Sequence, residues 1–593
     1  MQESYNRIRY KMVYIDKRTN LPVSNLNRSP FATDIPSMEL IRASNETLLK
    51  GVSGWRKVFA PSQESFQREL CQADAYLVAF VTQAFIEAFK PRKVILGLDT
   101  RPTGGAIADI ATRLFLARKV AVKHLFISAA PEIMAYSAHE QSLFFYISAS
   151  HNPVGYNGFK FGFAGGVVDA EANEKVLEHY LALLKKSEAL GQVKEAIEGV
   201  DKAELIATLD AIEAHKLSAL KHYANLLKQT FNAQIKFHAP LGIVGDLNGS
   251  ARTLSIDKTF LTSLGVKTVF FNAEPGAIVH QIEPEGEALE PCRRALEELY
   301  QEDQTFTLGY VCDNDGDRGN IVYIEQESRK AAVIPSQKLL ALIALIELSL
   351  AKEKDSRPAL VVNDATSLML DEVAAKLGVT VFRSEVGEAN VVSLAAEKRR
   401  AGWQVRVAGE GPNGGNIIHP SRVRDPLNTL VTLIKLLGSK ENFKKVTNLS
   451  TRASLSGALA MLPLRTITEI SSPEAKLSIK DGDLSRVKTN YLNRLPSEFA
   501  SRKEVLNKEF KIYSYRVEQT EGIKLRVGAE RPLQGGLKVL FLNKEGQASD
   551  FIWMRSSRTE PFLRIIADAQ GTHQRRHDYL LAWQRELILK SQR

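Results

Sequence analysis

The sequence predicts a soluble α/β protein of several domains, and three observations lead to that prediction. With 593 residues, the chain is longer than one hydrophobic core usually holds, so about four domains are expected. From residue 69 onward, amphipathic helices alternate with short apolar strands. Polar loops directly follow several of these strands, which is where an α/β sheet carries its functional groups.

The composition indicates a protein without a membrane segment. Hydrophobic residues make up 44% of the chain and charged residues 25%, as in ordinary globular proteins. The apolar run at 339–351 contains Glu347 and Ser349 and is too short to cross a bilayer. The three cysteines lie far apart and form no disulfide or metal pattern, and no signal segment opens the chain. We therefore expect a cytoplasmic location and no membrane partner.

The net charge of +10, from 78 basic and 68 acidic residues, suits an anionic substrate. The basic residues are spread along the chain instead of forming one block with interleaved aromatic residues. We therefore expect small anionic molecules as partners and no nucleic acid. The sequence makes no prediction of the oligomeric state.

The first part of the chain contributes one candidate residue. Residues 1 to about 45 are polar and are expected to form an arm or a partly ordered extension, to which the sequence assigns no chemical role. The segment Gly51–Lys57 then reads Gly-Val-Ser-Gly-Trp-Arg-Lys. Its glycines and serine let the backbone approach a phosphate closely, and Arg56 follows them. A surface arginine after a glycine turn is the alternative.

The first α/β region begins with a helix at 69–89 and a strand at 93–99, followed by the loop Asp99-Thr100-Arg101. The pattern at 167–232 is mostly helical, with apolar residues on one face of each segment and solvated charges between them. We expect this stretch to be structural.

A serine loop follows the apolar, aromatic strand at 143–147. An Asn-Pro step then breaks the chain, because proline disfavours helical backbone in the residue before it. Ser150 therefore lies on a turn at a strand end, where it can carry a phosphoryl group. His151 and Lys160 can donate to its oxygens or move protons. On these residues alone, an ordinary turn is an equal alternative.

An acidic loop follows the strand at 308–312. Asp313, Asp315 and Asp317 place three carboxylates at alternate positions on a tight turn. Oxygen ligands in this number suit one hard divalent cation, and Mg²⁺ is the natural candidate.

Two other kinds of site also contain an acidic loop of this type. A calcium-binding EF-hand needs glycine at the sixth position and glutamate at the twelfth, where this chain has Arg318 and Ile324. An aspartyl phosphatase of the haloacid-dehalogenase type would use Asp313 as its nucleophile. That alternative stays open, although it leaves the serine loop unexplained.

Two further loops contain candidate substrate contacts. Glu410 ends a strand that leads into the glycine-rich stretch Gly411–Asn416, where a carboxylate can accept hydrogen bonds from sugar hydroxyls. After the strand at 551–554, hydroxyl and guanidinium groups on one loop form a phosphate cradle. Its members are Arg555, Ser557, Arg558 and Thr559.

Together, these loops resemble those of the α-D-phosphohexomutases, the phosphoglucomutase and phosphomannomutase superfamily. The family wordings are Thr-Ala-Ser-His-Asn-Pro, Asp-Gly-Asp-Gly-Asp-Arg, Gly-Glu-x-Ser-Gly-His and Arg-x-Ser-Gly-Thr-Glu-Pro, and the chain carries its versions in the same order. The resemblance covers roughly residues 50–590. This chain departs from the family wording at Ser148, Asn314, Pro412 and Arg558, and the histidine of the third wording is absent.

The resemblance implies a four-domain fold: three similar α/β domains with mixed sheets and a C-terminal α+β domain around a central cleft. The implied boundaries are an N-terminal extension at 1–48 and domains at 49–236, 237–328, 329–447 and 448–593.

The resemblance also implies an isomerase that interconverts hexose 1-phosphate and hexose 6-phosphate, with glucose expected first and mannose next. Ser150, Asp313, Asp315 and Asp317 would hold Mg²⁺, and phosphorylated Ser150 would react through hexose 1,6-bisphosphate, which also acts as activator. Arg56, His151 and Lys160 would be catalytic together with Ser150. The implied substrate contacts are Arg318, Glu410, Asn413, Arg555, Ser557, Arg558 and Thr559. A metal-dependent aspartyl phosphatase and a catalytically weak sugar-phosphate-binding relative remain alternatives.

Overall fold

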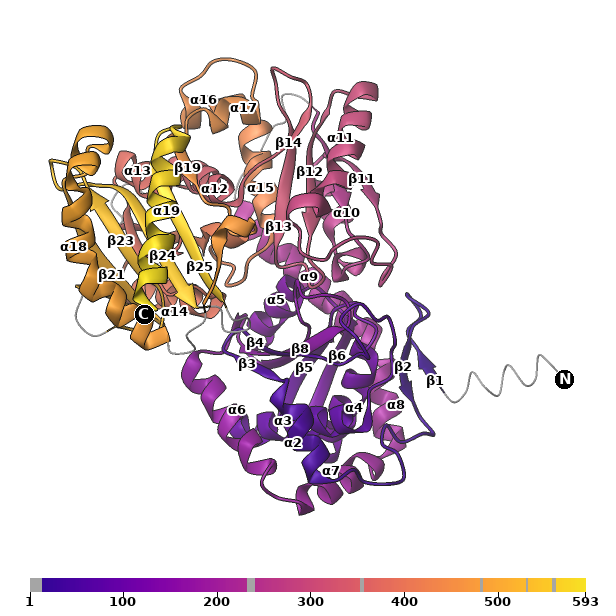
Figure 1. Cartoon of the computed structure of the whole chain (residues 1–593). Helices are drawn as coiled ribbons and strands as arrows, with labels where there is room; N and C mark the ends of the chain where they lie inside the picture. Colours follow the sequence, from indigo (N-terminus) through magenta and orange to yellow (C-terminus); the bar gives the residue numbers. More distant parts are fainter. Residues whose placement is uncertain are drawn as a thin grey trace. The chain divides into compact units, whose positions relative to one another are not determined.

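The structure, a computed structural model, describes residues 13–231, 240–351, 357–479, 484–528, 532–556 and 562–592. These residues form two compact units, each with mixed sheets covered by helices (Figure 1). Unit 1 contains the described residues up to 231, 242–319 and 421–426, and unit 2 contains those at 240–241, 320–420 and 427–592. The predicted α/β class with several mixed sheets is confirmed, whereas the four domain boundaries stay a prediction.

Unit 1 is built on a seven-stranded sheet that carries the serine loop. Its order is β3 (Leu49–Gly51), β4 (Gly54–Val58), β8 (Tyr156–Phe163), β7 (Leu143–Ile147), β5 (Lys93–Leu98) and β6 (Ala121–Ile127), with β9 (Gly166–Val167) beside β8. β7, β5 and β6 are parallel, whereas β8 runs antiparallel to β7. Because β5 and β7 are parallel neighbours, the loops after Leu98 and Ile147 leave the same edge of the sheet.

Helices cover this sheet, and aromatic side chains of the helices and strands form the core between them. The helices are α3 (Gln72–Phe89), α4 (Gly104–Ala117), α5 (Ala130–Glu140), α6 (Ala170–Leu183), α7 (Glu188–Glu198), α8 (Lys202–Asp210) and α9 (Ile212–Phe231). Phe85 of α3 packs edge-to-face against Phe115 of α4 and Phe145 of β7. The helical prediction for 167–232 is confirmed by α6 to α9.

The N-terminal segment, predicted to be an arm or a partly ordered extension, is folded in its described part. Its described part contains β1 (Val13–Ile15), β2 (Pro22–Asn25) and α2 (Met38–Glu46). Val23, Phe31 and Ile41 are buried in the same hydrophobic core as the sheet. This segment folds because its few apolar residues fall where they can be buried, a pattern that its polar composition hid.

A second sheet of unit 1 carries the acidic loop. β11 (Lys267–Phe271), β10 (Gly242–Asp246) and β12 (Phe306–Cys312) are parallel in that order. The accompanying helices are η1 (Ala251–Leu254), α10 (Asp257–Ser263), η2 (Gly286–Leu289) and α11 (Glu290–Glu302). β12 is almost wholly buried, and its last residue, Cys312, directly precedes the acidic loop.

Unit 2 begins with the antiparallel pair β13 (Gly319–Ile324) and β14 (Ala331–Val333), followed by a four-stranded sheet. That sheet has the order β16 (Thr380–Ser384), β15 (Pro358–Asn363), β17 (Gln404–Glu410) and β18 (Gly415–Ile418). Its helices are α12 (Ser336–Leu350), α13 (Met369–Lys376), α14 (Glu388–Arg400), η3 (Gly411–Asn413), α15 (Pro426–Leu437), α16 (Lys440–Thr447) and α17 (Leu455–Leu459). Glu410 is the last residue of β17, as predicted.

The C-terminal part of unit 2 is an antiparallel sheet with two long helices. The order is β19 (Arg465–Ile467), β25 (Phe562–Gln570), β24 (Ala548–Ser556), β23 (Leu537–Leu542), β21 (Ser514–Glu521) and β22 (Lys524–Val527), with β20 (Lys476–Ser478) beside β25 and η4 (Pro473–Ala475) before it. α18 (Leu484–Phe510) and α19 (Gln574–Ser591) share a core with the sheet, in which Trp583 stacks on Phe541.

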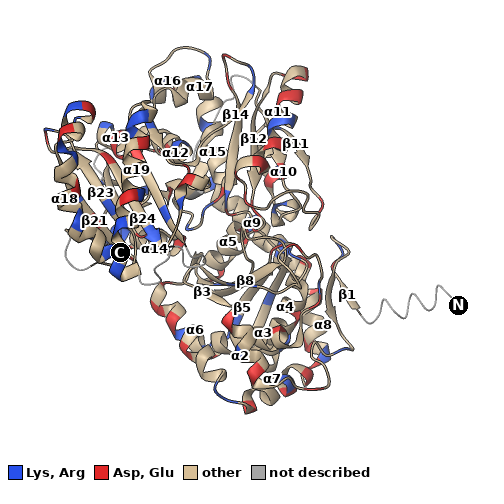
Figure 2. Cartoon of the chain, viewed as in Figure 1, with Lys and Arg blue, Asp and Glu red and all other residues tan. Residues whose placement is uncertain are grey.

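Acidic and basic residues alternate along the elements of both units (Figure 2). Among the described helices, none combines the length and the apolar character needed to cross a membrane.

Candidate functional site

Ser150 occupies a strained turn directly after β7. Its φ angle is +53°, a left-handed conformation that is unfavourable for a residue with a side chain. Its backbone N–H donates to the Ser148 hydroxyl at 2.8 Å, and its carbonyl oxygen accepts from Arg101 at 2.7 Å. The departure from threonine at Ser148 therefore keeps the hydroxyl group that this turn uses.

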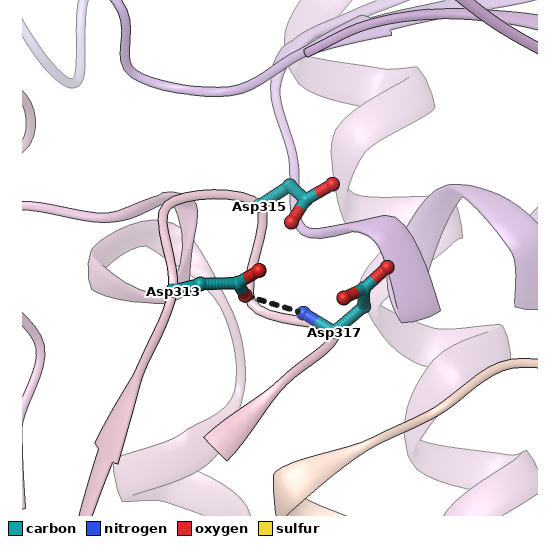
Figure 3. A group of neighbouring side chains, drawn as sticks. All are labelled: Asp313, Asp315 and Asp317. Carbon is teal, nitrogen blue, oxygen red and sulfur yellow. Dashed lines mark hydrogen bonds between the residues drawn. The ribbon is translucent and has the colours of Figure 1, made fainter. Parts of the chain in front are cut away.

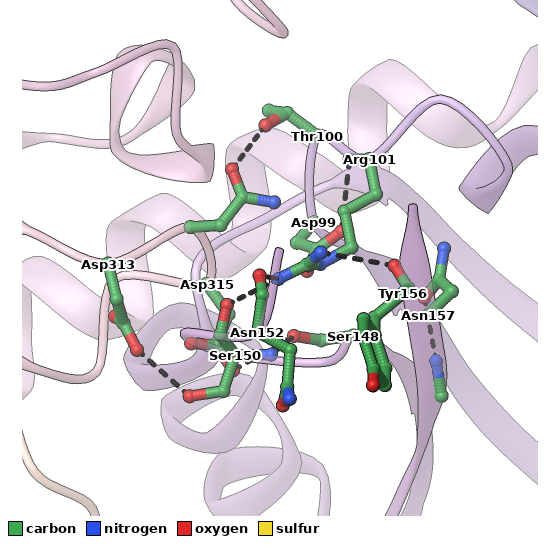
Figure 4. A network of polar contacts seen from close by, with 12 residues as sticks. Asp99, Thr100, Arg101, Ser148, Ser150, Asn152, Tyr156, Asn157, Asp313 and Asp315 are labelled. Atoms are coloured by element: carbon green, nitrogen blue, oxygen red, sulfur yellow. Dashed lines mark hydrogen bonds and ion pairs between the residues drawn. The ribbon is translucent and has the colours of Figure 1, made fainter. Parts of the chain in front are cut away.

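Arg101 holds the whole serine loop in place (Figure 4). Its side chain is fully buried, and its Nε donates to Asp99 Oδ2 at 3.1 Å. The rest of the guanidinium donates to four carbonyl oxygens of the loop, those of Ser150, Asn152, Pro153 and Tyr156. The Asp-Thr-Arg triplet after a strand is visible in the sequence, but no role was predicted for Arg101.

The acidic loop gathers three carboxylates in a small volume (Figure 3). One oxygen from each of Asp313, Asp315 and Asp317 lies within 4.8 Å of the others, and all three residues are buried. Asp313 Oδ1 accepts from the backbone N–H groups of Asp317 and Arg318, each at 3.1 Å. Gly316 has a φ angle of +69°, and a Cβ there would lie 2.7 Å from the Arg252 side chain, so the turn requires glycine.

The serine loop and the acidic loop meet within unit 1. The Ser150 hydroxyl donates to Asp313 Oδ2 at 2.9 Å, and the Ser148 hydroxyl donates to Asp315 Oδ2 at 3.0 Å. Lys160 of β8 donates to both Asp315 and Asp317. Residues far apart in sequence, which were predicted to share a phosphoryl-transfer site, are therefore in direct contact.

The residues of this cluster fit a divalent cation. Burial, and then the neighbouring Asp315 and Asp317, raise the pKa of Asp313 well above its usual range. Asp315 Oδ1 is buried without a hydrogen-bond partner among the described residues. Three carboxylates and a serine hydroxyl form an all-oxygen donor set of the kind that Mg²⁺ prefers.

Basic groups surround the cluster. Arg424 donates to both oxygens of Asp317 at 3.0 Å. The Nε atoms of Arg56 and Arg318 are buried and have no hydrogen-bond partner among the described residues, so an incoming phosphate would satisfy them. Desolvation, and next the charge of Arg318, lower the pKa of Arg56 to about 10, which leaves it protonated at neutral pH.

His151 lies next to the reacting hydroxyl. Its Nδ1 is 3.5 Å from Ser150 Oγ. Desolvation and three nearby arginines lower the pKa of His151 well below its usual range, so the ring is neutral at pH 7. A neutral imidazole can accept a proton from a hydroxyl group.

Thr100 and Arg424, for which no role was predicted, support the site from other segments. Thr100 donates through its hydroxyl to the side-chain oxygen of Asn314 at 2.7 Å. Asn314 is buried and stands where the family has glycine, so this departure ties the acidic loop to the loop that contains Arg101. Arg424 belongs to the short segment 421–426, which has no sequence signal of its own.

We predict that Asn314→Gly lowers the free energy of unfolding by about 1 kcal/mol, because it removes one buried hydrogen bond. Thr100→Val should cost a similar amount, and the double variant should cost less than the sum of the two. Chemical denaturation of the three variants measures this coupling. Strictly additive losses would contradict a direct Thr100–Asn314 interaction.

The remaining predicted residues belong to unit 2. Glu410 is buried, and its Oε1 accepts from Gly387 N–H at 2.7 Å and Asn363 Nδ2 at 3.2 Å. Arg555 donates to Glu385 Oε1 at 2.9 Å. Ser557, Arg558 and Thr559 lie outside the described residues, as does the side chain of Asn413. The substrate-binding roles of all these residues stay predictions.

Comparison with protein families matches two segments of the chain. Residues 47–186 match the family described as phosphoglucomutase/phosphomannomutase, alpha/beta/alpha domain I. Residues 335–453 match domain III of the same family. The first segment contains the serine loop, and the second contains Glu410.

Similar curated proteins include a phosphoglucosamine mutase of Methanococcus vannielii, 26% identical over 57% of this chain and 67% of that protein. A phosphoglucomutase/phosphomannomutase of Thermococcus kodakarensis is 27% identical over 60% of this chain and 71% of that protein. A probable phosphoglucosamine mutase of Methanocella arvoryzae is matched over only 59% of its length.

Solved structures share the fold over almost the whole chain. A phosphoglucomutase/phosphomannomutase family protein of Burkholderia thailandensis has a TM-score of 0.60 at 17% identity, covering 92% of this chain and 97% of that one. The open form of pp63/parafusin, a phosphoglucomutase of Paramecium, has a TM-score of 0.59 at 18% identity, covering 92% and 94%.

Proposed function

The chain belongs to the α-D-phosphohexomutase superfamily, and from that premise we propose that it interconverts hexose 1-phosphate and hexose 6-phosphate. The observation that carries the proposal is the Ser150 hydroxyl, held 2.9 Å from Asp313 among buried carboxylates and arginines. This arrangement suits phosphoryl transfer, in which positioning and charge neutralisation provide most of the catalysis. Sugar phosphates as partners and a cytoplasmic location belong to the same proposal.

In the proposed reaction, Ser150 carries the phosphoryl group. A free hydroxyl of the sugar monophosphate attacks the phosphorus, and the bond between phosphorus and Ser150 Oγ breaks. The sugar becomes a hexose 1,6-bisphosphate, and its hydroxyl proton passes to a base. Arg56, Lys160 and His151 are the candidates for the general acid or base. After the bisphosphate turns over, Ser150 Oγ attacks the phosphorus of the other phosphoryl group, and the bond between that phosphorus and the sugar oxygen breaks. The protonated base returns its proton to the sugar oxygen, so the phosphoserine is regenerated and the isomeric monophosphate is released.

The other site residues would bind the phosphoryl group, the metal ion and the sugar. Arg56 and Arg318 would hold the phosphoryl oxygens through their free Nε–H groups. Asp313, Asp315 and Asp317, with Ser150, would hold Mg²⁺, which when bound neutralises charge at the transferring group. In unit 2, Glu410 and Asn413 would bind sugar hydroxyls. The phosphate that does not react would bind Arg555, Ser557, Arg558 and Thr559.

Glucose phosphates are our first choice of substrate, with mannose phosphates next. Glucosamine 1-phosphate belongs in the test because similar proteins are phosphoglucosamine mutases. The three 1-phosphates should be incubated separately with Mg²⁺ and a trace of the corresponding 1,6-bisphosphate. We expect glucose 6-phosphate to form fastest. Release of inorganic phosphate would favour the aspartyl phosphatase, and ligand stabilisation without conversion would favour a binding protein.

We predict that Mg²⁺ stabilises the folded protein. At a hundredfold excess over its dissociation constant, a ligand specific to the folded state adds about 2.7 kcal/mol, seen as a rise in Tm. Asp315→Asn should remove this response, because it replaces a ligand whose free oxygen has no other partner. Asp34→Asn, at an exposed position, is the matched control and should respond like the parent. An unchanged response in Asp315→Asn would contradict the assigned metal site.

A further inference from the structure

Unit 2 contains a cavity that has no part in the proposed reaction. Its volume is about 390 Å³, and its lining comes from β16, α14, β21, β22, β23 and the segments that adjoin them. Apolar side chains, such as Leu394, Ile523 and Leu540, form one part of the wall, and polar groups form the larger part. Six charged residues also line it: Arg383, Lys398, Arg516, Lys538, Asp371 and Glu518.

Lys538 is the unusual member of this lining. It is only 1% exposed, and its ammonium group has no hydrogen-bond partner among the described residues. The face of the Phe551 ring, 4.2 Å away, provides a cation–π contact but accepts no hydrogen bond from it in this structure. Desolvation, and next the charge of Arg383, lower the pKa of Lys538 to about 8, so most of it is still charged at neutral pH.

The acidic groups of the cavity already have partners. Asp371 accepts two hydrogen bonds from Arg383, at 2.8 and 2.6 Å. Glu518 accepts from Arg516 at 2.9 Å. The Nε–H of Arg383 points to no acceptor among the described residues. Two buried cationic N–H donors, Lys538 Nζ and Arg383 Nε, therefore have no acceptor among the described residues, in a cavity large enough to hold an anion.

We propose that this cavity binds a small phosphomonoester with a compact apolar body. Its phosphate would accept hydrogen bonds from Lys538 Nζ and Arg383 Nε, while its body would pack against Leu394, Ile523 and Leu540. Four basic and two acidic residues line the cavity, so a doubly charged head group matches it better than a carboxylate does. The apolar part of the wall has no hydrogen-bond partner for the hydroxyl groups of a bare sugar phosphate. This proposal does not depend on the mutase activity.

Binding of phenyl phosphate to the intact protein tests the proposal. Lys538→Met keeps the length of the side chain and removes the charge, and we expect it to weaken phenyl phosphate binding at this site about tenfold. Lys440→Met, at an exposed position, should bind like the parent. Titration calorimetry with inorganic phosphate, benzoate and glucose 6-phosphate separates the contributions of the head group and the body. All three should bind this site more weakly than phenyl phosphate.

A second measurement locates the binding. Acetic anhydride labelling at pH 8, read by peptide mass spectrometry, should show Lys538 protected by phenyl phosphate and Lys440 unaffected. Without ligand, Lys538→Met should melt at the same temperature as the parent or higher, because it removes an unpaired buried charge. The proposal is overturned if Lys538→Met binds phenyl phosphate as tightly as the parent does. It is also overturned if benzoate protects Lys538 better than phenyl phosphate, or if the ligand-free variant melts lower.

Discussion

Replacing Ser150 with alanine is expected to reduce turnover at least about a thousandfold while the protein still folds. The hydroxyl oxygen is the atom proposed to carry the phosphoryl group, so no other side chain can take its place. Structurally, the change removes one hydrogen bond to Asp313 and leaves the backbone contacts of the loop intact. Conversion of glucose 1-phosphate measures turnover, and circular dichroism with thermal melting measures the fold.

Ser150→Gly is the matched variant for this experiment. Glycine adopts the φ angle of +53° without strain, whereas alanine keeps the cost of about 1–2 kcal/mol that a side chain has there. Both variants should be inactive, but the glycine variant should be the more stable. Ser148→Ala, which removes only an orienting hydroxyl, should keep more activity than either. Substantial turnover in Ser150→Ala would defeat the assignment.

Replacing Arg101 with methionine is expected to give the second-largest loss. The change leaves buried Asp99 without its cation and four loop carbonyls without their donor. Breaking a buried ion pair in this way costs about 3–5 kcal/mol of stability. Misplacing Ser150 should also lower kcat about a hundredfold, mainly without changing KM. Denaturation and steady-state kinetics measure the two effects separately.

Arg113→Met is the control for general damage to the same unit. Arg113 is also buried, and it pairs with Asp109 and donates to the Asn25 carbonyl, but it makes no contact with the serine loop. It should cost stability with little effect on kcat. Arg101→Lys should restore the charge but not the hydrogen bonds to all four loop carbonyls. Its kcat should therefore lie between those of the parent and Arg101→Met. Equal losses of kcat in Arg101→Met and Arg113→Met would contradict a positioning role.

The parts of the fold and site that could be predicted from sequence are those encoded locally. Buried strands such as β7 and β12 are continuous apolar runs, and Ser150 and the three aspartates stand in loops directly after them. Such signals depend on neighbouring residues, so one sequence is enough to find them.

The parts that could not be predicted depend on contacts between distant segments. Thr100 donates a hydrogen bond to Asn314, and Arg424 donates one to Asp317. Nothing near Thr100 or Arg424 in the sequence indicates these partners. The N-terminal segment looked like an arm because its buried Val23, Phe31 and Ile41 are widely spaced among polar residues. Lys538 resembles any strand lysine until the structure places it in a cavity.

Transfer of a labelled phosphoryl group tests the central claim most directly. One sample of the protein should be incubated with glucose 1,6-bisphosphate carrying ³²P and then digested, so that the labelled peptide can be identified. A second labelled sample should be chased with unlabelled glucose 6-phosphate before digestion. We predict label on Ser150 alone, and its recovery in glucose 1,6-bisphosphate after the chase. Label on Asp313, or label on Ser150 that leaves only as inorganic phosphate, would contradict a phosphoryl group passed between serine and sugar.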